Sequence, residues 1–151
     1  MNLNAMGSEQ AAVAAVIDPD VLTAAAHSSG YVDMADFESV LAIVMAGTLG
    51  SGATLDAKLQ QATDSSGTGV KDITGAAITQ LTQAGSDSDK QATIGCRAED
   101  LDIANGFRFV KLVITVATAS SDGAGLILGM NGHSLPASDN DASTVDEVVN
   151  V

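Results

Sequence analysis

Aromatic residues are the scarcest class in this chain. Its 151 residues include three Phe, one Tyr and no Trp, so aromatic residues make up only 3% of the sequence. Sugar-binding platforms and grooves for single-stranded nucleic acid both rely on flat aromatic surfaces. The composition therefore disfavours both kinds of site.

Basic residues are scarce as well. Six Lys and Arg stand against 19 Asp and Glu, which gives a net charge of −13. A surface with this charge repels nucleic acid and anionic lipid. We therefore expect no nucleic-acid partner and no membrane partner.

Residues that carry chemistry are few. Cys96 is the only cysteine, which excludes an intrachain disulfide and a cysteine-based zinc site. We expect it to be a small buried hydrophobic residue. The two histidines, His27 and His133, lie at opposite ends of the sequence, and the stretch "GTGVKD" lacks the Gly-Lys-Ser/Thr ending of a phosphate loop. We expect no catalytic residue, no metal site and no cofactor, and we predict that the chain is not an enzyme.

Acidic turns recur along the chain, as "DSSG", "DSD", "SDG" and "DND". None has the twelve-residue spacing of a calcium-binding loop. We expect solvated turns, in which Asp, Ser and Gly supply the backbone geometry. The alternative is a cation shared between subunits.

Targeting signals are missing from the N-terminal segment. "MNLNAMGSEQ" has no Lys or Arg before the apolar "AAVAAVI", so it lacks the pattern of a secretory signal. The longest apolar run, Val40 to Ala46, is far shorter than a membrane span. We expect a soluble protein made in the cytoplasm.

Residues 1–29 differ in composition from the rest of the chain, because they are rich in Ala and poor in bulky side chains. We predict an N-terminal arm that becomes ordered against another subunit. Asp18 and Pro19 fit an N-cap and a first helical position, so a short helix from Pro19 to Ala26 is one form of this arm, and an extended chain is the other. The candidate interface residues in the arm are Val13, Val16, Ile17, Val21 and Leu22.

Residues 30–136 have the pattern of strands separated by turns. A β-rich run extends from Phe37 to Thr48, and "TLDAKLQQAT" alternates Leu55, Ala57 and Leu59 with polar residues. Shorter strands are expected on both sides of Gly75 and in "QATIGCRA". We predict an all-β domain with an antiparallel, jelly-roll-like β-sandwich.

The clearest strand is "GFRFVKLVITVAT", residues 106–118. One face carries only apolar residues and the other is mixed, which is typical of a central strand with a partly covered outer face. We expect the fully apolar side of this strand to hold the two sheets together, and "LILGMNG" to follow as the hairpin partner. The residues on that side are Val110, Leu112, Ile114 and Val116.

Phe107, Arg108 and Phe109 are further interface candidates. An arginine between two aromatic residues is a natural anchor of a protein–protein interface. The alternative, which we favour from the sequence, is an ion pair inside the domain.

Residues 137–151 form an acidic tail. This tail is either loose or adds an edge strand through "TVDEVVNV".

Three stretches together resemble a known family. They are "GYVDMADFESVLAIVMAGTL", "AKLQQATDSSGTGVKDITGAA" and "GFRFVKLVITVATASSDGAGLILGMNGHSLP". Over about residues 30–136 the chain resembles small virion structural proteins of tailed bacteriophages, the β-sandwich head proteins that decorate or cement the capsid. The "RFVKL" of Arg108 to Leu112 is also similar to discoidin-like sugar-binding sandwiches, but their tryptophans and cysteine pair are missing here.

This resemblance implies a function. We expect a capsid decoration (cement) protein on the capsid surface of the virion, which stabilises the head shell against internal DNA pressure. Its partners would be the major capsid protein and itself, as a homotrimer at a local three-fold axis. One alternative is a head–tail connector or tail structural protein, and another is a carbohydrate-binding β-sandwich module.

Overall fold

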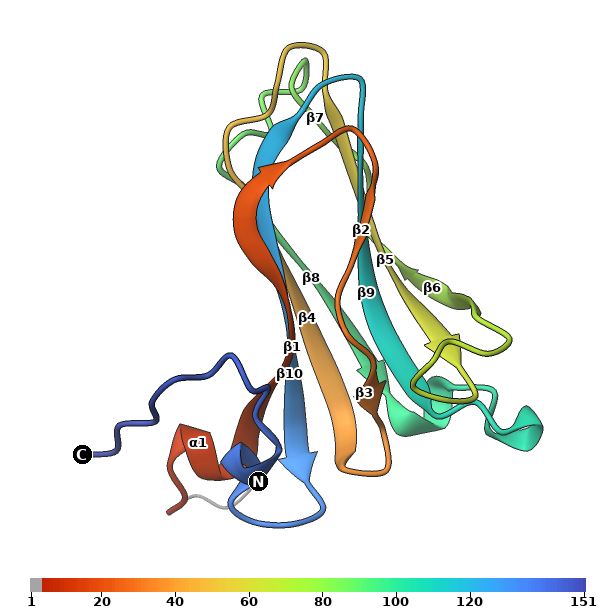
Figure 1. Cartoon of the computed structure of the whole chain (residues 1–151), viewed down its shortest axis with the longest axis vertical. Helices are drawn as coiled ribbons and strands as arrows, with labels where there is room; N and C mark the ends of the chain where they lie inside the picture. Colours follow the sequence, from red (N-terminus) through yellow and green to blue (C-terminus); the bar gives the residue numbers. More distant parts are fainter. Residues whose placement is uncertain (1–3) are drawn as a thin grey trace.

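Two antiparallel sheets pack face to face in the computed structural model, which describes residues 4–151 (Figure 1). Sheet A contains, in spatial order, β1 (Ala11–Leu22), β10 (Ser121–Gly132), β4 (Phe37–Ala46) and β8 (Gln91–Arg97). Sheet B contains β2 (Ala26–Ser28), β9 (Phe109–Ala117), β5 (Thr54–Ala62) and β6 (Lys71–Ala77). The short strands β3 (Val32–Asp33) and β7 (Leu81–Thr82) pair with β9 and β5.

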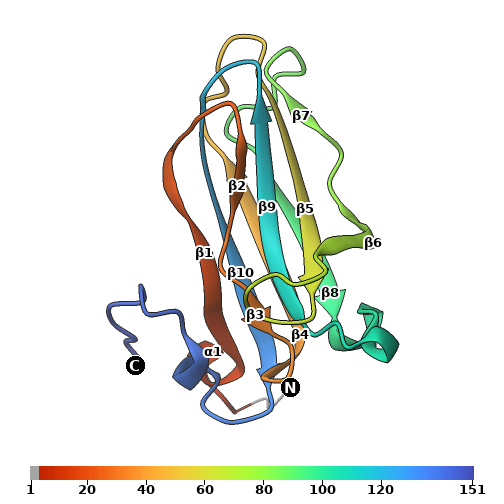
Figure 2. The same ribbon diagram turned by 45° about the vertical axis from the view of Figure 1, so that its right-hand side comes forward.

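Short helical turns lie only at the lower end of the sandwich, as drawn in Figure 1. They are α1 (Gly7–Gln10), η1 (Ala98–Asp100), η2 (Ile103–Asn105) and η3 (Ala137–Asn140). Among residues 4–151, no helix has the length and hydropathy needed to cross a bilayer. Figure 2 shows α1 and the C-terminal tail together beside the lower end of β1.

Strand pairing is nested. β1 pairs with β10, β2 with β9, β4 with β8 and β5 with β6, so the two halves of the chain run against each other from the ends inwards. This nesting distributes successive strands between two sheets, as in a jelly roll. The prediction of an all-β, antiparallel, jelly-roll-like sandwich is confirmed.

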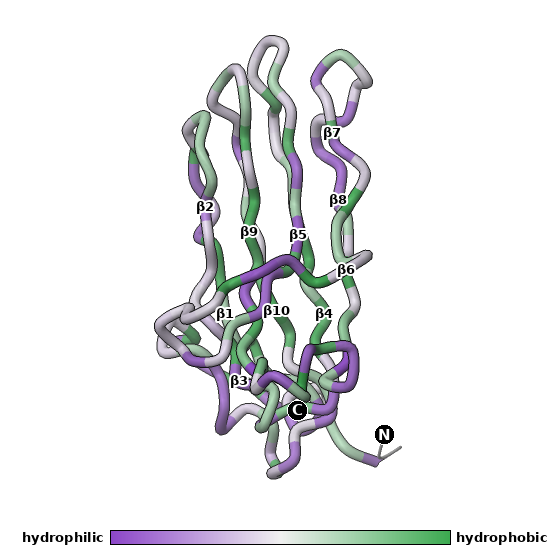
Figure 3. Tube along the Cα trace, turned by 90° about the vertical axis from the view of Figure 1, so that its right-hand side faces the viewer, coloured by the Kyte–Doolittle hydropathy of each residue, from purple (hydrophilic) through white to green (hydrophobic). Residues whose placement is uncertain are grey.

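The core lies between the sheets and contains mostly aliphatic side chains. The predicted inner residues of β9 are at most 2% exposed, and those of β5 at most 3%. Burial of such side chains is the main favourable contribution to folding. Figure 3 shows the hydrophobic colour running along the strands, while the hydrophilic colour gathers mainly in the connections.

The predicted N-terminal arm is wrong for residues 11–28. Residues 11–22 form β1, which pairs with β10 along its length, and residues 26–28 form β2. The helix predicted from Pro19 to Ala26 is also wrong. Pro19 instead lies in a register shift of β1 between Ile17 and Asp20, and an edge strand tolerates proline at such a bulge. Residues 4–10 precede β1, and residues 1–3 lie outside the described part.

The predicted hairpin between residues 106–118 and "LILGMNG" is wrong as well. β9 belongs to sheet B and β10 to sheet A, so the chain crosses between sheets in residues 118–120. Ser121 is buried in this corner, where its hydroxyl accepts a hydrogen bond of 3.0 Å from the backbone N–H of Gly50. Turn residues mark both hairpins and corners, which explains the error.

The C-terminal tail forms no strand. After η3, the backbone N–H of Ala142 donates to the carbonyl of Val13, and the Asp141 carboxylate accepts from the N–H of Val13. These two bonds attach the tail to the edge of β1. The edge-strand alternative for "TVDEVVNV" is therefore wrong, while Val149 and Val151 remain exposed to solvent.

Candidate functional site

In β10 the smaller side chains mostly point into the core and the larger ones mostly point out of it. The inward positions are Gly123, Gly125, Ile127 and Gly129, whereas the outward positions are Ala124, Leu126, Leu128 and Met130. Glycine is required at two of these positions, because a Cβ on Gly125 would lie 2.7 Å from the Leu112 side chain and one on Gly129 would lie 2.4 Å from the Phe37 ring. Apart from the buried Ile127, the large apolar residues of this strand face outwards.

β4 follows the same arrangement. Its inner face carries Val40, Ala42, Val44 and Ala46, all at most 4% exposed, and its outer face carries the larger Leu41, Ile43 and Met45. An ordinary half-solvated antiparallel sheet places apolar residues inside and polar residues outside. Sheet A departs from that rule in two adjacent central strands.

Strand register joins these outward residues into one surface. Val13 lies opposite Leu128, which lies opposite Leu41, and the next row is Val16, Leu126 and Ile43. Directly opposed residues share a face of the sheet and contact each other. We call this surface the apolar face, and it consists of Val13, Val16, Leu41, Ile43, Met45, Ala124, Leu126, Leu128 and Met130.

The outer face of sheet B has the opposite character. Lys58 pairs with Asp72 at 2.8 Å, and Gln60 donates a 2.7 Å hydrogen bond to the same carboxylate. The Lys111 ammonium lies 5.2 Å from the centre of the Tyr31 ring. The two broad sides of the molecule therefore differ, one apolar and one polar.

A shallow hollow of about 400 Å³ lies at the upper end of the apolar face. The residues that line it include Pro19, Asp20, Val21, Met45 and Asp122. Val21 and Met45 are 58% and 46% exposed, which is high for apolar side chains. This hollow extends the apolar face to the top of the sheet.

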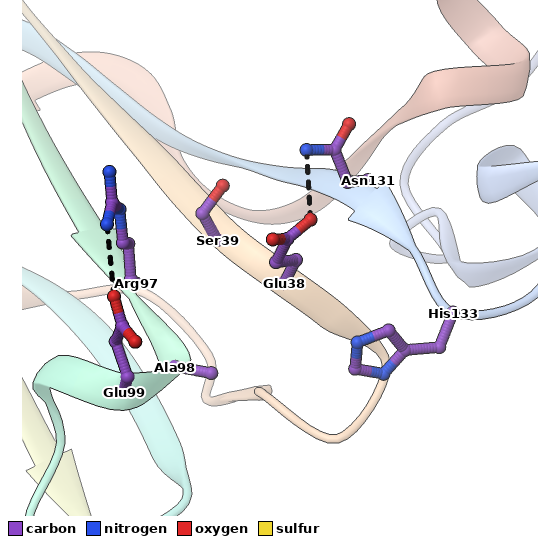
Figure 4. A pocket seen from close by; sticks show the side chains of 7 residues that line it. All are labelled: Glu38, Ser39, Arg97, Ala98, Glu99, Asn131 and His133. Carbon is purple, nitrogen blue, oxygen red and sulfur yellow. Dashed lines mark hydrogen bonds and ion pairs between the residues drawn. The ribbon is translucent and has the colours of Figure 1, made fainter. Parts of the chain in front are cut away.

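A second, polar hollow lies at the lower end of the same sheet (Figure 4). Arg97 donates a 3.0 Å hydrogen bond to Glu99, and Asn131 donates one of 3.3 Å to Glu38. The bond to Glu99 raises the pKa of the Arg97 guanidinium above its usual range. The lining side chains are Glu38, Ser39, Arg97, Ala98, Glu99, Asn131 and His133.

His27 lies in β2 of sheet B, and His133 directly follows β10 of sheet A. The histidines bond to backbone carbonyls of nearby turns, His27 through Nε2 to Thr23 and His133 through Nδ1 to Ala35. Within residues 4–151, no group of three or more His, Cys, Asp or Glu side chains is placed to hold a metal ion. The lower hollow also presents no Trp, Tyr or Phe on which a sugar ring would stack.

The predicted interface residues of β1 divide between two environments. Val13, Val16 and Val21 lie on the outer side of sheet A. Ile17 and Leu22 point into the core and are only 7% and 4% exposed, so these two are corrected from interface to core residues. The alternation of β1 and its bulge decide this division.

Phe107, Arg108 and Phe109 are engaged within the domain. The Arg108 guanidinium binds both carboxylate oxygens of Asp33 at 2.8 Å, and it lies 5.0 Å from the centre of the Phe109 ring. The Lys71 ammonium lies 4.1 Å from the centre of the Phe107 ring. The favoured alternative, an ion pair inside the domain, describes Arg108 correctly.

Cys96 is a core residue, as predicted. It lies on the inner side of β8 and is 5% exposed. Burial, with a smaller contribution from Asp100, raises the pKa of its thiol to about 11. A buried, protonated thiol is a poor nucleophile.

Sequence reasoning missed most of the apolar face, including Leu41, Ile43, Leu126 and Leu128. One signal was present, because "GAGLILGMNG" alternates glycine with larger apolar residues. Glycine at every second position indicates close contact with another layer on that side. The larger residues then have to lie on the opposite side.

Comparisons with known proteins find similar folds but no protein with a similar sequence. No family model matches the chain, and no curated protein matches it. Solved structures with a similar fold include a chain of broad bean stain virus (15% identity, TM-score 0.39), a chain of infectious bursal disease virus Gt strain (12%, 0.41) and the xylan-binding module CBM15 (14%, 0.34).

The aligned portions differ among these three structures. They include 75%, 84% and 80% of this chain, and 60%, 33% and 89% of the respective matched chains. The chain thus spans less than two thirds of each of the two viral chains. At these identities and TM-scores the similarity concerns the β-sandwich fold and carries no information on function.

Proposed function

We propose that this chain is a capsid decoration (cement) protein, which binds the outside of a bacteriophage head shell through the apolar face and stabilises the shell. One observation carries the proposal: β4 and β10 turn their large apolar side chains outwards. A contiguous apolar surface of this kind marks an interaction site. The resemblance to virion structural proteins of tailed bacteriophages supports the choice of partner.

The size of the apolar face suits a specific contact. Three strands about 4.8 Å apart, with about seven residues of about 3.3 Å each, make a flat area of roughly 330 Å². A standard interface buries roughly 800 Å² on each partner. The apolar face therefore has the size of the apolar centre of such an interface, and the polar residues around it would supply the remaining area.

A protein that acts by binding the repeated surface of a shell needs no catalytic centre. Many modest contacts add up when a shell presents many identical sites and each molecule binds more than one of them. A homotrimer at a local three-fold axis of the shell provides this multivalency. Such self-association would use other surfaces, for example the free edge of β8, because the apolar face is occupied by the shell.

The test is retention on purified heads of the phage that encodes the chain. Leu126→Gln combined with Ile43→Gln places two polar amides at the centre of the apolar face, and we expect occupancy to fall at least tenfold because hydrophobic burial is lost. Val70→Gln is the matched control, since Val70 is 44% exposed but lies outside the apolar face.

Copy number completes this test. A decoration protein approaches the number of capsid sites, whereas a connector or tail protein is present in few copies per particle. Full retention of a folded double variant, or a copy number far below that of the capsid sites, would contradict the proposal.

A further inference from the structure

The charges around the apolar face point to the chemistry of the surface that covers it: an apolar patch bordered at both ends by lysine or arginine side chains. This inference rests on the proposed function for the identity of the partner. The chemistry of the covering surface can be tested separately. Interfaces of this kind have an apolar centre and a polar rim, and charge complementarity in the rim selects the partner.

The upper end of the face is negative. Asp20 and Asp122 line the upper hollow, and neither forms an ion pair with any residue of the described chain. The nearby cation at the start of β8, Lys90, is already paired with Asp87 at 2.7 Å. Asp122, which lies opposite Val21 on the outer side of the sheet, and Asp20 beside it are thus left without a cation at this hollow.

The lower end is negative as well. In the lower hollow, Arg97 is paired with Glu99, which leaves the carboxylate of Glu38 with only the neutral Asn131 as a hydrogen-bond partner (Figure 4). Asp100 lines an adjoining hollow with Leu41 and Met130. Both ends of the sheet therefore carry an excess of negative charge.

The apolar face itself contains no charged residue, and most cations of the chain lie elsewhere. Lys58 and Lys71 are paired with Asp72 and Asp102, and Arg108 is paired with Asp33, all on the side of sheet B. Lys111 lies over Tyr31 on the outer face of sheet B. None of these four cations is therefore placed to neutralise the two acidic ends.

A second copy of this chain fits the face poorly. In a two-fold symmetric pair of stacked sheets, the axis lies in the contact plane, either along the strands or across them. With the axis along the strands, the upper end of one copy meets the upper end of the other. With the axis across the strands, the upper end of one copy meets the lower end of the other. Both arrangements place carboxylates against carboxylates. A partner with basic ends meets the same carboxylates with attraction.

The first experiment uses beads as the probe. Beads coated with hexyl chains are compared with beads coated with hexyl chains and primary amines, at about 0.05 and about 0.5 M NaCl. We expect the chain to prefer the mixed coating about tenfold at low salt and to lose that preference at high salt, because screening weakens exposed charge contacts.

Variants locate the contact on the molecule. Asp20→Asn with Asp122→Asn and Glu38→Gln removes the acidic ends, and we expect most of the low-salt preference to disappear. Asp56→Asn combined with Asp146→Asn and Glu147→Gln is the charge-matched control. It also removes three negative charges, one on the outer face of sheet B and two in the C-terminal tail, and it should retain the preference. Equal binding to both coatings, or equal effects of the rim and control variants, would overturn the inference.

The second experiment repeats the salt series on purified heads. Retention that falls about tenfold with salt, and less so in the rim variant, supports the inference. Retention that is unchanged or stronger at high salt contradicts it, as does a salt-promoted dimer of the isolated chain that Leu126→Gln abolishes. Absence of head binding at every salt concentration, with the bead preference intact, contradicts the proposed function and leaves the chemistry of the face established.

Discussion

At the scale of single residues, glycine on the inner side of β10 decides which way its neighbours point. A Cβ on Gly129 would lie 2.4 Å from the ring of Phe37, which is itself 2% exposed. The ring fills the space above the glycine and closes the lower end of the core. The outward positions of Leu128 and Met130 follow from this contact, because side chains alternate along a strand.

This contact predicts the effect of one added methyl group. Gly129→Ala should destabilise the fold by about 1–3 kcal/mol, since overpacking forces Phe37 or the backbone to move. Gly95→Ala is the control in the same sheet, because a Cβ there meets nothing within 4 Å. Urea unfolding followed by circular dichroism measures both. Equal unfolding midpoints for the two variants would show that Phe37 does not require the glycine.

At the scale of elements, β1 is the strand for which the prediction from the sequence differs most from the structure. It pairs with β10 and contributes Ala12, Ala15, Ile17 and Leu22 to the core. A short Ala-rich segment looks dispensable by composition, because it lacks bulky residues. Its small side chains suit an inner face on which two sheets approach closely.

Truncation of β1 tests this role. Removing residues 1–22 should abolish cooperative folding, because burial of Ile17 and Leu22 alone is worth about 3–6 kcal/mol, a large part of a typical total of about 5–15 kcal/mol. Removing residues 143–151 is the matched control and should leave the melting temperature nearly unchanged. A shortened chain that still unfolds cooperatively at the same temperature would restore the picture of an independent arm.

At the scale of the whole molecule, several carboxylates are stabilised in their charged form. Hydrogen bonds from Lys58 and then Gln60 lower the pKa of Asp72, and those from Lys71 and then Asn105 lower the pKa of Asp102. A hydrogen bond from Lys90 lowers the pKa of Asp87. All three pKa values fall below the ordinary 3.8.

These shifts predict an acid-sensitive fold. A carboxylate whose pKa is lowered on folding stabilises the protein at pH values above its unfolded pKa, and this contribution is lost as the pH falls through the folded pKa. The melting temperature should therefore be level near pH 6 and fall below about pH 4. Asp72→Asn should make the acid-side decline shallower, with Asp146→Asn in the tail as control. A melting temperature that rises below pH 4 would contradict this account.

Periodicity and composition were enough to predict the class of the fold and several strands. The alternation in residues 54–62 and 109–117 correctly predicted which side of each strand faces the core, although Gln61 and Val113 are buried as well. The net charge and the scarcity of aromatic residues also belong to the sequence alone. The buried position of Cys96 followed from the same reasoning.

Only the tertiary structure decided which sheet each strand joins and which side of sheet A faces the core. Pairing of β1 with β10 links residues more than a hundred positions apart, and turn residues do not distinguish a hairpin from a corner between sheets. Alternation defines two faces of β10 but assigns neither to the core when one is mostly glycine and the other is mostly leucine and methionine. The opposing layer makes that choice, because Phe37, Leu112 and Ile114 leave room for glycine alone at positions 125 and 129, and the apolar face is the consequence.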